Sequence, residues 1–208
     1  GLVAAHSGSS IDLNYKNDFS ISVDDDPTNL TISATGTDSQ VKIKADRLTM
    51  KGELQADNNG IIGIIAGMNS QVIGAAKLGD NTGAINIVFD KASVWRLSDS
   101  SELSYLKMTN STLDFSSWKP IVSALDSGSS EVYRLLRTRT WAGNNNTLKM
   151  KIDLGKEDMS NVFTDQFIIA ADATGSHIVD INIDGSELVP EKLHSINWLI
   201  SQGEGSNM

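Results

Sequence analysis

The chain has 208 residues, of which 39% are hydrophobic and 21% charged, enough for one large all-β domain or two small ones and too apolar for disorder. The formal net charge of −9 argues against binding to nucleic acid or to an anionic membrane surface, because both need clustered lysine and arginine. No cysteine is present, which excludes disulfides and thiolate metal sites.

The first 89 residues carry short runs in which apolar and polar residues alternate, a pattern that predicts strands with one buried face. Clusters of turn-forming residues separate the runs at 24–27, 35–38, 57–60 and 79–83. The expected inward-facing residues are Ile11, Leu13, Tyr15, Phe19, Ile21, Val23, Leu30, Ile32, Ala34, Val41, Ile43, Ala45, Leu48, Met50, Leu54, Ile85, Ile87 and Phe89.

The most apolar stretch, residues 61–78, does not predict a membrane span, because Asn69, Ser70 and Gln71 interrupt it and glycines recur along it. The chain begins at Gly1 with neither an initiator methionine nor a basic and apolar leader. We therefore interpret it as an excised fragment, whose lack of targeting signals says nothing about the parent protein.

The pattern is less regular at residues 118–139, where segments 121–125 and 132–136 each have the spacing of one helical turn. Alternation then returns, and further strands are expected near residues 148–154, 167–170, 179–183 and 196–200. All four tryptophans lie from position 95 onward, and such bulky rings suit the sealed end of an open core: Trp95, Trp118, Trp141 and Trp198.

Strand starts recur about every ten residues, which fits either an antiparallel β-sandwich or a β-solenoid. Three features favour the solenoid. The strands are short and similar in length, their polar neighbours are mostly Ser, Thr, Asn, Lys and Asp, and no long central strand stands out. A coil of two or three strands would span roughly 20 to 25 residues, as solenoid repeats do. Because no exact repeat exists, composition and period alone leave both folds open.

An ordered series of segments lies between residues 83 and 205: 92–97, 100–103, 106–115, 133–136, 141–144, 148–154, 164–169, 173–177 and 184–187. Taken in this order, the series resembles the C-terminal passenger region of bacterial autotransporters of the pertactin-like and AIDA-like group. Residues 1–82 match that group only as generic β-helix rungs. The chain departs from the pattern at 118–130, a longer and more polar insertion, and at Trp141, where a smaller aliphatic residue is commoner.

The resemblance implies an all-β, right-handed parallel β-helix (a β-solenoid) with a C-terminal capping region. Residues 1–90 would form β-helix rungs of the passenger. Residues 91–206 would form the last rungs and an autochaperone-like cap, continuous with the preceding rungs. In that family the cap folds first after crossing the outer membrane and templates the rest of the passenger, and a membrane β-barrel follows in the parent.

The function implied is that of a cell-surface autotransporter passenger of the adhesin or virulence-factor type, secreted through the outer membrane. The expected partners are a host surface or extracellular ligand, or the same protein on other cells. Nucleic acid is not an expected partner, and the fragment itself is not expected to span a membrane. We expect no enzyme, cofactor or metal site. The alternatives are a β-helix polysaccharide-active enzyme and a β-sandwich binding module.

One motif matches a calcium-binding loop, in which carboxylates and amides at alternate positions supply oxygen ligands. It comprises Asp180, Asn182, Asp184, Gly185 and Glu191. Ile181 and Ile183 interleave with these residues as on a strand, Pro190 precedes Glu191, and no amphipathic helices flank the segment. We therefore interpret it as a strand that ends in a turn.

Other motifs are weaker. Residues 125–129 are similar to an aspartic-protease loop, but the only partial second copy, residues 172–175, has the wrong spacing. The histidines are widely separated, without zinc-site spacing: His6, His177 and His194. No nucleophile-elbow motif exists. The one basic cluster is interpreted as a solvated strand face rather than an anion or sugar contact: Arg134, Arg137 and Arg139. Asp24, Asp25 and Asp26 are interpreted as a turn.

Overall fold

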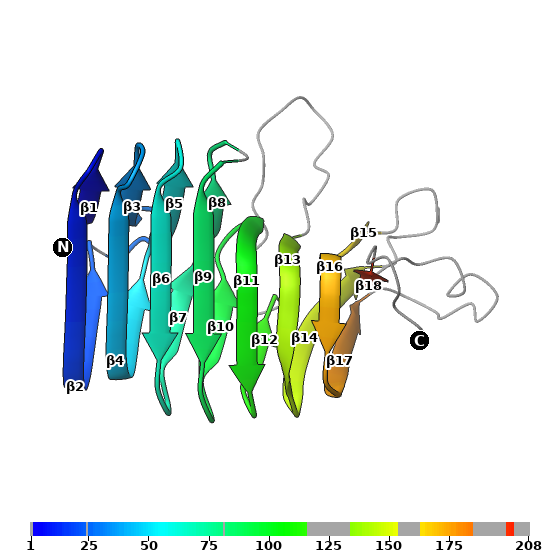
Figure 1. Ribbon diagram of the computed structural model, residues 1–208. Helices are drawn as coiled ribbons and strands as arrows, with labels where there is room; N and C mark the ends of the chain where they lie inside the picture. Colours follow the sequence, from blue (N-terminus) through cyan, green and yellow to red (C-terminus); the bar gives the residue numbers. More distant parts are fainter. Residues whose placement is uncertain are drawn as a thin grey trace.

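The computed structural model describes residues 2–23, 25–80, 82–115, 134–153, 163–184 and 199–201. These residues form an all-β, solenoid-like molecule in which the chain winds through successive coils stacked along one axis (Figure 1). Within these ranges there is no helix, and therefore none long and apolar enough to cross a membrane. The strands are β1 (Val3–His6), β2 (Ser10–Ser22), β3 (Leu30–Thr35), β4 (Gln40–Lys51), β5 (Glu53–Asp57), β6 (Ile61–Ala66), β7 (Gln71–Gly74), β8 (Ala76–Leu78), β9 (Ala84–Phe89), β10 (Val94–Leu97), β11 (Ser101–Thr109), β12 (Thr112–Asp114), β13 (Leu135–Asn144), β14 (Asn146–Asp153), β15 (Phe163–Thr164), β16 (Gln166–Thr174), β17 (His177–Asp184) and β18 (Leu199–Ser201).

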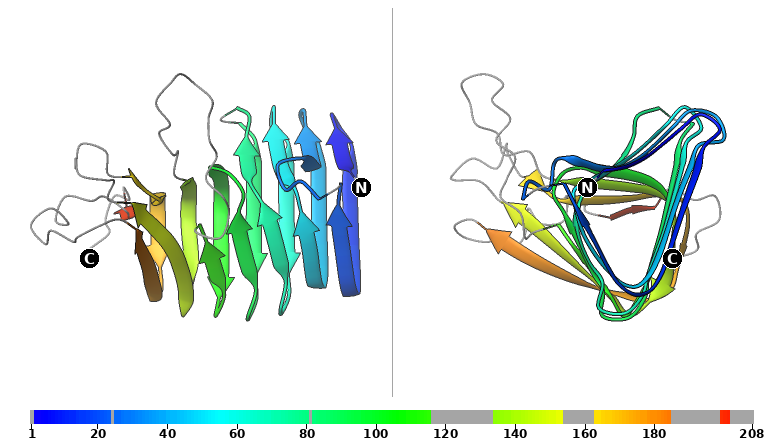
Figure 2. Two further views of the ribbon diagram at one scale, coloured as in Figure 1. Left: turned by 180° about the vertical axis from the view of Figure 1, so that it is seen from behind. Right: turned by 90° about the vertical axis from the view of Figure 1, so that its left-hand side faces the viewer.

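Seen along the stacking axis, the early coils have a triangular outline (Figure 2). We call its sides A, B and C. Side A holds β1, β3, β5 and β8, side B begins with β2, β4, β6 and β9, and side C holds β7, β10, β12, β14 and β17. Strand β4 joins sides B and C, because Gln40 to Ala45 pair with β6 whereas Thr49 to Lys51 pair with β7. Every described pairing is parallel except that of β14 with the short β15.

The core is one column of inward-facing side chains that runs through all the coils. On side B, Ile43, Ile64, Ile87, Leu106 and Trp141 are register partners in turn, and each is at most 4% exposed. Side C has the equivalent series Met50, Val72, Trp95, Leu113 and Leu148. Because burial of each large apolar side chain contributes roughly 1.5 to 3 kcal/mol, stacking these residues is the main stabilising term of the fold.

The alternation predicted for the first 89 residues is confirmed for most of the expected core. Ile32, Leu54 and Ala76 succeed one another in register, so these coils repeat about every 22 residues, within the predicted range. The parallel pairing also differs from that of an antiparallel sandwich, the alternative that the sequence left open. Three residues expected inside are exposed instead, since they flank corners or a register shift: Tyr15, Val23 and Leu30.

Two expectations were wrong. Strand lengths are not uniform, because β2 and β4 continue around a corner and reach 13 and 12 residues. The described part of residues 132–136 is not helical: Leu135 and Leu136 begin β13, where Leu136 points into the core and pairs with Phe167, while residues 132 and 133 lie outside the described residues. Residues 121–125 lie outside the described residues. The apolar stretch 61–78 forms β6, β7 and β8.

Candidate functional site

From the coil of β6 onward, the corner between sides B and C contains one left-handed residue per coil, whereas β2 and β4 turn it without one. Asn69, Ala92, Asn110 and Asn145 have φ angles of 59°, 58°, 47° and 55°. The backbone N–H of each donates to a carbonyl of the next coil, at 2.8 to 3.0 Å. Three of the four are asparagine, which tolerates this conformation better than most residues do. The corner therefore keeps the same shape as coils are added.

The residue after each of these turns is polar and buried, and together they form a ladder inside the corner. We call Ser70, Ser93, Ser111 and Asn146 the corner ladder; each is at most 3% exposed. Leu48 N–H donates to Ser70 Oγ, Ser70 N–H to Ser93 Oγ, and Ser111 N–H to Asn146 Oδ1, at 2.9 to 3.2 Å. The ladder satisfies backbone donors that would otherwise be buried without a partner.

His177, on β17, continues the ladder into the next coil, and its contact with Asn146 determines its tautomer. Asn146 Nδ2 donates to the Met108 carbonyl at 2.9 Å and lies 3.2 Å from His177 Nδ1. Because the amide is oriented by Met108 and Ser111, Nδ1 must accept and the ring proton sits on Nε2, which faces the Thr174 carbonyl. Burial lowers the pKa of His177, which keeps the ring neutral near pH 7.

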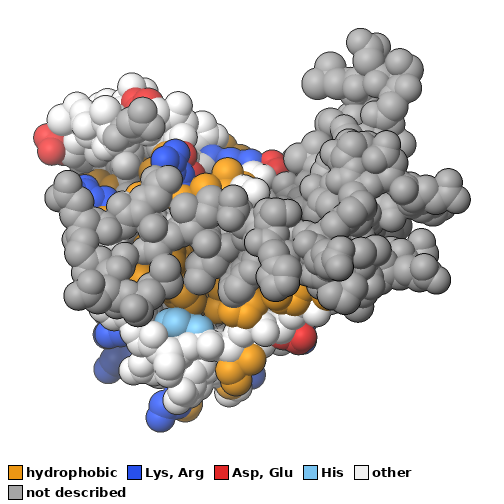
Figure 3. Space-filling model, turned by 90° about the vertical axis from the view of Figure 1, so that its right-hand side faces the viewer, with side chains coloured by type: hydrophobic (Ala, Val, Ile, Leu, Met, Phe, Trp, Pro, Cys, Tyr) orange, Lys and Arg blue, Asp and Glu red, His pale blue; other side chains and the backbone are white. Residues whose placement is uncertain are grey.

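Rings cluster around this end of the stack. His177 stacks on Trp141 with ring centroids 3.7 Å apart, and Trp141 meets Phe167 edge-on at 4.8 Å. Phe167 lies 6.4 Å from Phe115. Figure 3 shows the C-terminal end of the stack, where apolar side chains lie beside a histidine among the described residues. One coil earlier, Trp95 donates from Nε1 to the Gly74 carbonyl at 3.1 Å.

A buried charged cluster lies at the corner between sides C and A. Asp165 is 1% exposed, and its two carboxylate oxygens accept the backbone N–H groups of Arg134 and Lys151 at 3.1 and 2.7 Å. Arg134 is 7% exposed and donates from Nη1 to the Phe115 carbonyl at 2.5 Å. Burial raises the pKa of Asp165 to about 6 despite the backbone donors and Arg134. The cluster ties three successive passes of the chain together.

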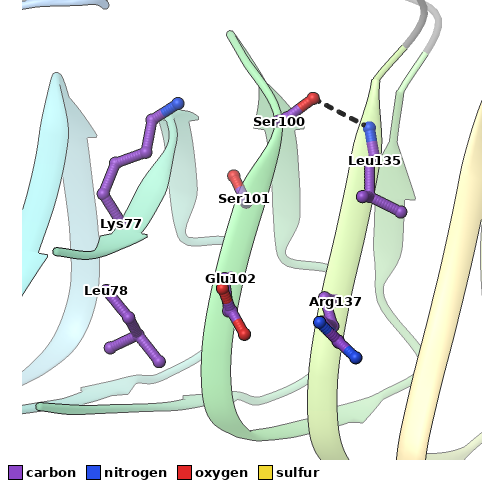
Figure 4. A pocket seen from close by; sticks show the side chains of 7 residues that line it. All are labelled: Lys77, Leu78, Ser100, Ser101, Glu102, Leu135 and Arg137. Atoms are coloured by element: carbon purple, nitrogen blue, oxygen red, sulfur yellow. Dashed lines mark hydrogen bonds between the residues drawn. The ribbon is translucent and has the colours of Figure 1, made fainter. Parts of the chain in front are cut away.

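One pocket, of about 240 Å³, opens on side A (Figure 4). Its lining residues are Lys77, Leu78, Ser100, Ser101, Glu102, Leu135 and Arg137. It lies where the corner between sides A and B changes: β8 is followed by the turn at residues 79–83, whereas β11 and β13 run from side A to side B without a break.

Charged groups in this pocket face one another from neighbouring strands. Glu102 is the direct register partner of Arg137, and both side chains extend toward the same end of the pocket in Figure 4. Lys77 Nζ is ion-paired with Asp99 Oδ2 at 2.5 Å. Burial raises the pKa of Glu53; the charge of Lys77 opposes this shift and that of Asp99 adds to it. The lining thus carries two cations, Lys77 and Arg137, and one carboxylate, Glu102, beside a partly exposed Leu78 and Leu135; Asp99 does not line the pocket but is paired with Lys77.

The calcium-like motif is only partly within the described residues, and that part is a strand. Asp180 and Asn182 lie on β17, paired in parallel with Lys149 and Lys151 of β14. An extended backbone with cations on the neighbouring strand does not bring carboxylates together as a calcium loop does. Gly185 and Glu191 lie outside the described residues.

The other sequence candidates are not brought together. His6 lies on β1 and His177 on β17, at opposite ends of the stack, and His194 lies outside the described residues, as do residues 125–129. Among the residues that are described, no three of His, Asp and Glu gather in a way that would hold a metal ion. The interpretation of the basic cluster as a solvated face was wrong for Arg134, because its guanidinium extends into the core side of the corner. Asp26 caps a turn by accepting from Thr28, as expected; Asp24 is not described.

The corner ladder has a weak signal in the sequence, which the alternation of apolar and polar residues does not reveal. Asn69-Ser70, Asn110-Ser111 and Asn145-Asn146 each pair a residue that tolerates a positive φ with a small polar residue. The pairs recur at unequal spacings, because insertions lengthen some coils, so a search for a fixed period does not find them. Of the pocket lining, only Arg137 belonged to a cluster named from the sequence, because β8, β11 and β13 supply the residues from separate parts of the chain.

No protein-family model, no curated protein and no solved structure matches this chain.

Proposed function

We propose that the chain is a passenger segment of a bacterial autotransporter, a right-handed parallel β-helix displayed on the cell surface, whose later coils nucleate its folding. In this proposal, residues 1–90 are rungs that fold onto residues 91–206, which include the capping region. The parent continues into an outer-membrane β-barrel. The partners are a host surface or extracellular ligand, or copies of the same protein on neighbouring cells. The role is structural and adhesive rather than catalytic.

The observation that carries the proposal is the unequal distribution of large buried rings along one continuous column. Trp95, Phe115, Trp141 and Phe167 all follow residue 90 and are at most 4% exposed, whereas among the described residues before position 90 one ring, Phe89, is buried to that degree. In a stack of coils, stability is approximately the sum of local terms and nearest-neighbour interfaces. A segment that buries the largest side chains is therefore the part able to fold first and offer an edge on which further coils assemble.

The buried polar groups support the same assignment. Asp165 and Asn146 each satisfy groups on different passes of the chain, so the later coils are joined by specific bonds as well as by apolar contact. Such bonds fix a unique register, which a template for further coils requires.

Display on cells tests the proposal directly. Residues 1–208 would be fused upstream of a heterologous autotransporter barrel in a Gram-negative host, and surface exposure measured with an external protease and an N-terminal epitope tag. We expect the full segment and residues 91–208 to reach the surface in a folded, protease-resistant form. Residues 1–90 fused alone should be displayed poorly or degraded. Equal display of both halves would contradict the nucleating role, and retention of all three fusions inside the cell would contradict the passenger assignment.

A further inference from the structure

We propose that the pocket on side A binds a small neutral polyhydroxyl ligand, a single sugar ring, through Glu102 and Arg137 beside Leu78 and Leu135. This inference is independent of the passenger proposal, because binding is measured on the folded chain whereas folding order is measured without a ligand.

Two charged side chains in the pocket lie side by side without pairing. Glu102 and Arg137 are directly opposite on adjacent parallel strands, about 4.8 Å apart at the backbone. Among the described residues they nevertheless form no ion pair with each other, unlike Lys77 and Asp99 beside them. A carboxylate and a guanidinium held side by side present acceptors next to donors. This is the arrangement that neighbouring hydroxyl groups, which are both donors and acceptors, satisfy with charge-assisted hydrogen bonds.

The charges of the pocket nearly balance. Lys77 and Arg137 line it as cations and Glu102 as an anion, and Lys77 is paired with Asp99 beside the lining, so the pocket favours neither a polyanion nor a cation. The serines are largely used by the fold. Ser101 Oγ accepts from Ala76 N–H and donates to the Asp99 carbonyl, and Ser100 Oγ accepts from Leu135 N–H. They hold the wall in place and leave recognition to the charged pair.

The size and lining of the pocket suit one sugar ring. At about 240 Å³ it is smaller than the roughly 300 to 1,000 Å³ of sites for drug-sized molecules. Leu78 and Leu135 line it from different strands, with Glu102 between them in Figure 4, so the lining offers apolar contact for C–H groups and charged groups for hydroxyls. The pocket opens on the outer surface of the coils, so a terminal sugar of a larger glycan can enter it.

The experiment is a titration of the full chain, followed by amide NMR shifts, with separate neutral monosaccharides: glucose, galactose, mannose, fucose and N-acetylglucosamine. We expect at least one to bind saturably, with a Kd of about 1 mM, as a shallow site for one ring allows, and with shifts centred on Lys77, Glu102 and Arg137. Glu102→Gln and Arg137→Lys should each weaken that binding about tenfold, because each removes a charge-assisted or bidentate bond.

Two matched controls separate recognition from general surface charge. Arg139→Lys changes an exposed arginine on the same strand, and Asp172→Asn changes an exposed carboxylate on β16; neither should alter the Kd. Glucuronate, glucosamine and glycine serve as anionic, cationic and zwitterionic probes. The proposal is overturned if no neutral sugar saturates, if a charged or zwitterionic probe binds and the neutral sugars do not, or if the control variants weaken binding as much as the pocket variants.

Discussion

The early coils, up to residue 90, and the later coils are stacked in the same parallel way but fill their core differently. Early inward positions hold mostly aliphatic residues, such as Ile43, Ile62 and Ile64. Later positions hold tryptophan and phenylalanine rings in contact with one another, together with the buried carboxylate of Asp165. Coils with the same parallel register can thus differ in stability. In a stacked fold, the stability of each coil depends on the side chains that it buries more than on its backbone pattern.

The largest expected effect comes from removing a ring at the start of the later coils. Trp95→Ala should lower the free energy of unfolding by about 3 to 5 kcal/mol, because it deletes a fully buried indole and its bond to Gly74. Val72→Ala, one coil earlier in the same column, should cost about 1 to 2 kcal/mol. Urea unfolding measures both. Equal losses in the free energy of unfolding would show that buried rings do not make the later coils more stable than the early ones.

The second effect concerns the buried carboxylate and its pH dependence. The folded-state pKa of Asp165 is raised from 3.8 to about 6, so the folded chain binds a proton that the unfolded chain does not between these values. Its stabilising contribution is therefore complete below about pH 4 and is lost as the pH rises through about 6, a change of up to about 3 kcal/mol. Relative to Asp165→Asn, the parent chain should gain stability as the pH falls from 7 to 4.

His177 should act in the opposite direction in the same coils. Its folded-state pKa is lowered below 6.5, so its contribution is complete above 6.5 and is lost as the pH falls through the folded-state pKa. His177→Gln should remove part of any loss of stability on acidification. Measuring the free energy of unfolding of Asp165→Asn and His177→Gln at each pH separates the two opposing contributions.

If the free energies of unfolding of the parent and of Asp165→Asn differ by the same amount at every pH, the pKa of Asp165 is not raised as described.

The smallest expected effect on the free energy of unfolding comes from replacing a glycine by alanine at two contrasting positions. A Cβ on Gly143, where φ is 136°, would lie 1.6 Å from the Met108 carbonyl oxygen, so Gly143→Ala should cost about 1 to 3 kcal/mol. A Cβ on Gly63, on the open face of side B, would come no closer than 3.9 Å to Lys42, and Gly63→Ala should change stability by less than about 1 kcal/mol. Thermal unfolding of the pair tests whether coil spacing is tighter at Gly143 than on the flat face.

The strands and their buried faces could be predicted from the sequence because period-two alternation reports burial directly. Val41, Ile43 and Ala45 illustrate this, since all three are buried as expected. Corners could not be predicted in the same way: Tyr15 continues the alternation but lies at a register shift and is exposed, stacked on Phe19. The parallel pairing rests on contacts between distant residues, which no local pattern encodes.

The candidate sites show the same limit. Arg134 has the sequence context of a surface cation, yet Asp165 and Phe115, from other passes of the chain, enclose it. Glu102 and Arg137 become neighbours only because a long insertion between them leaves the register of β11 and β13 intact. Motifs along the chain therefore identified Arg134 and Arg137 but not their partners Asp165 and Glu102, which come from other strands.

The most direct test of the account is the stability of the two halves expressed separately. Residues 91–206 alone should be soluble and resist protease, with far-ultraviolet circular dichroism typical of β-structure. Residues 1–90 alone should be digested rapidly under the same conditions, because their aliphatic column lacks the edge on which it assembles. If residues 1–90 prove the more resistant half, the later coils are not the nucleus, and the ring-rich column is not what organises this fold.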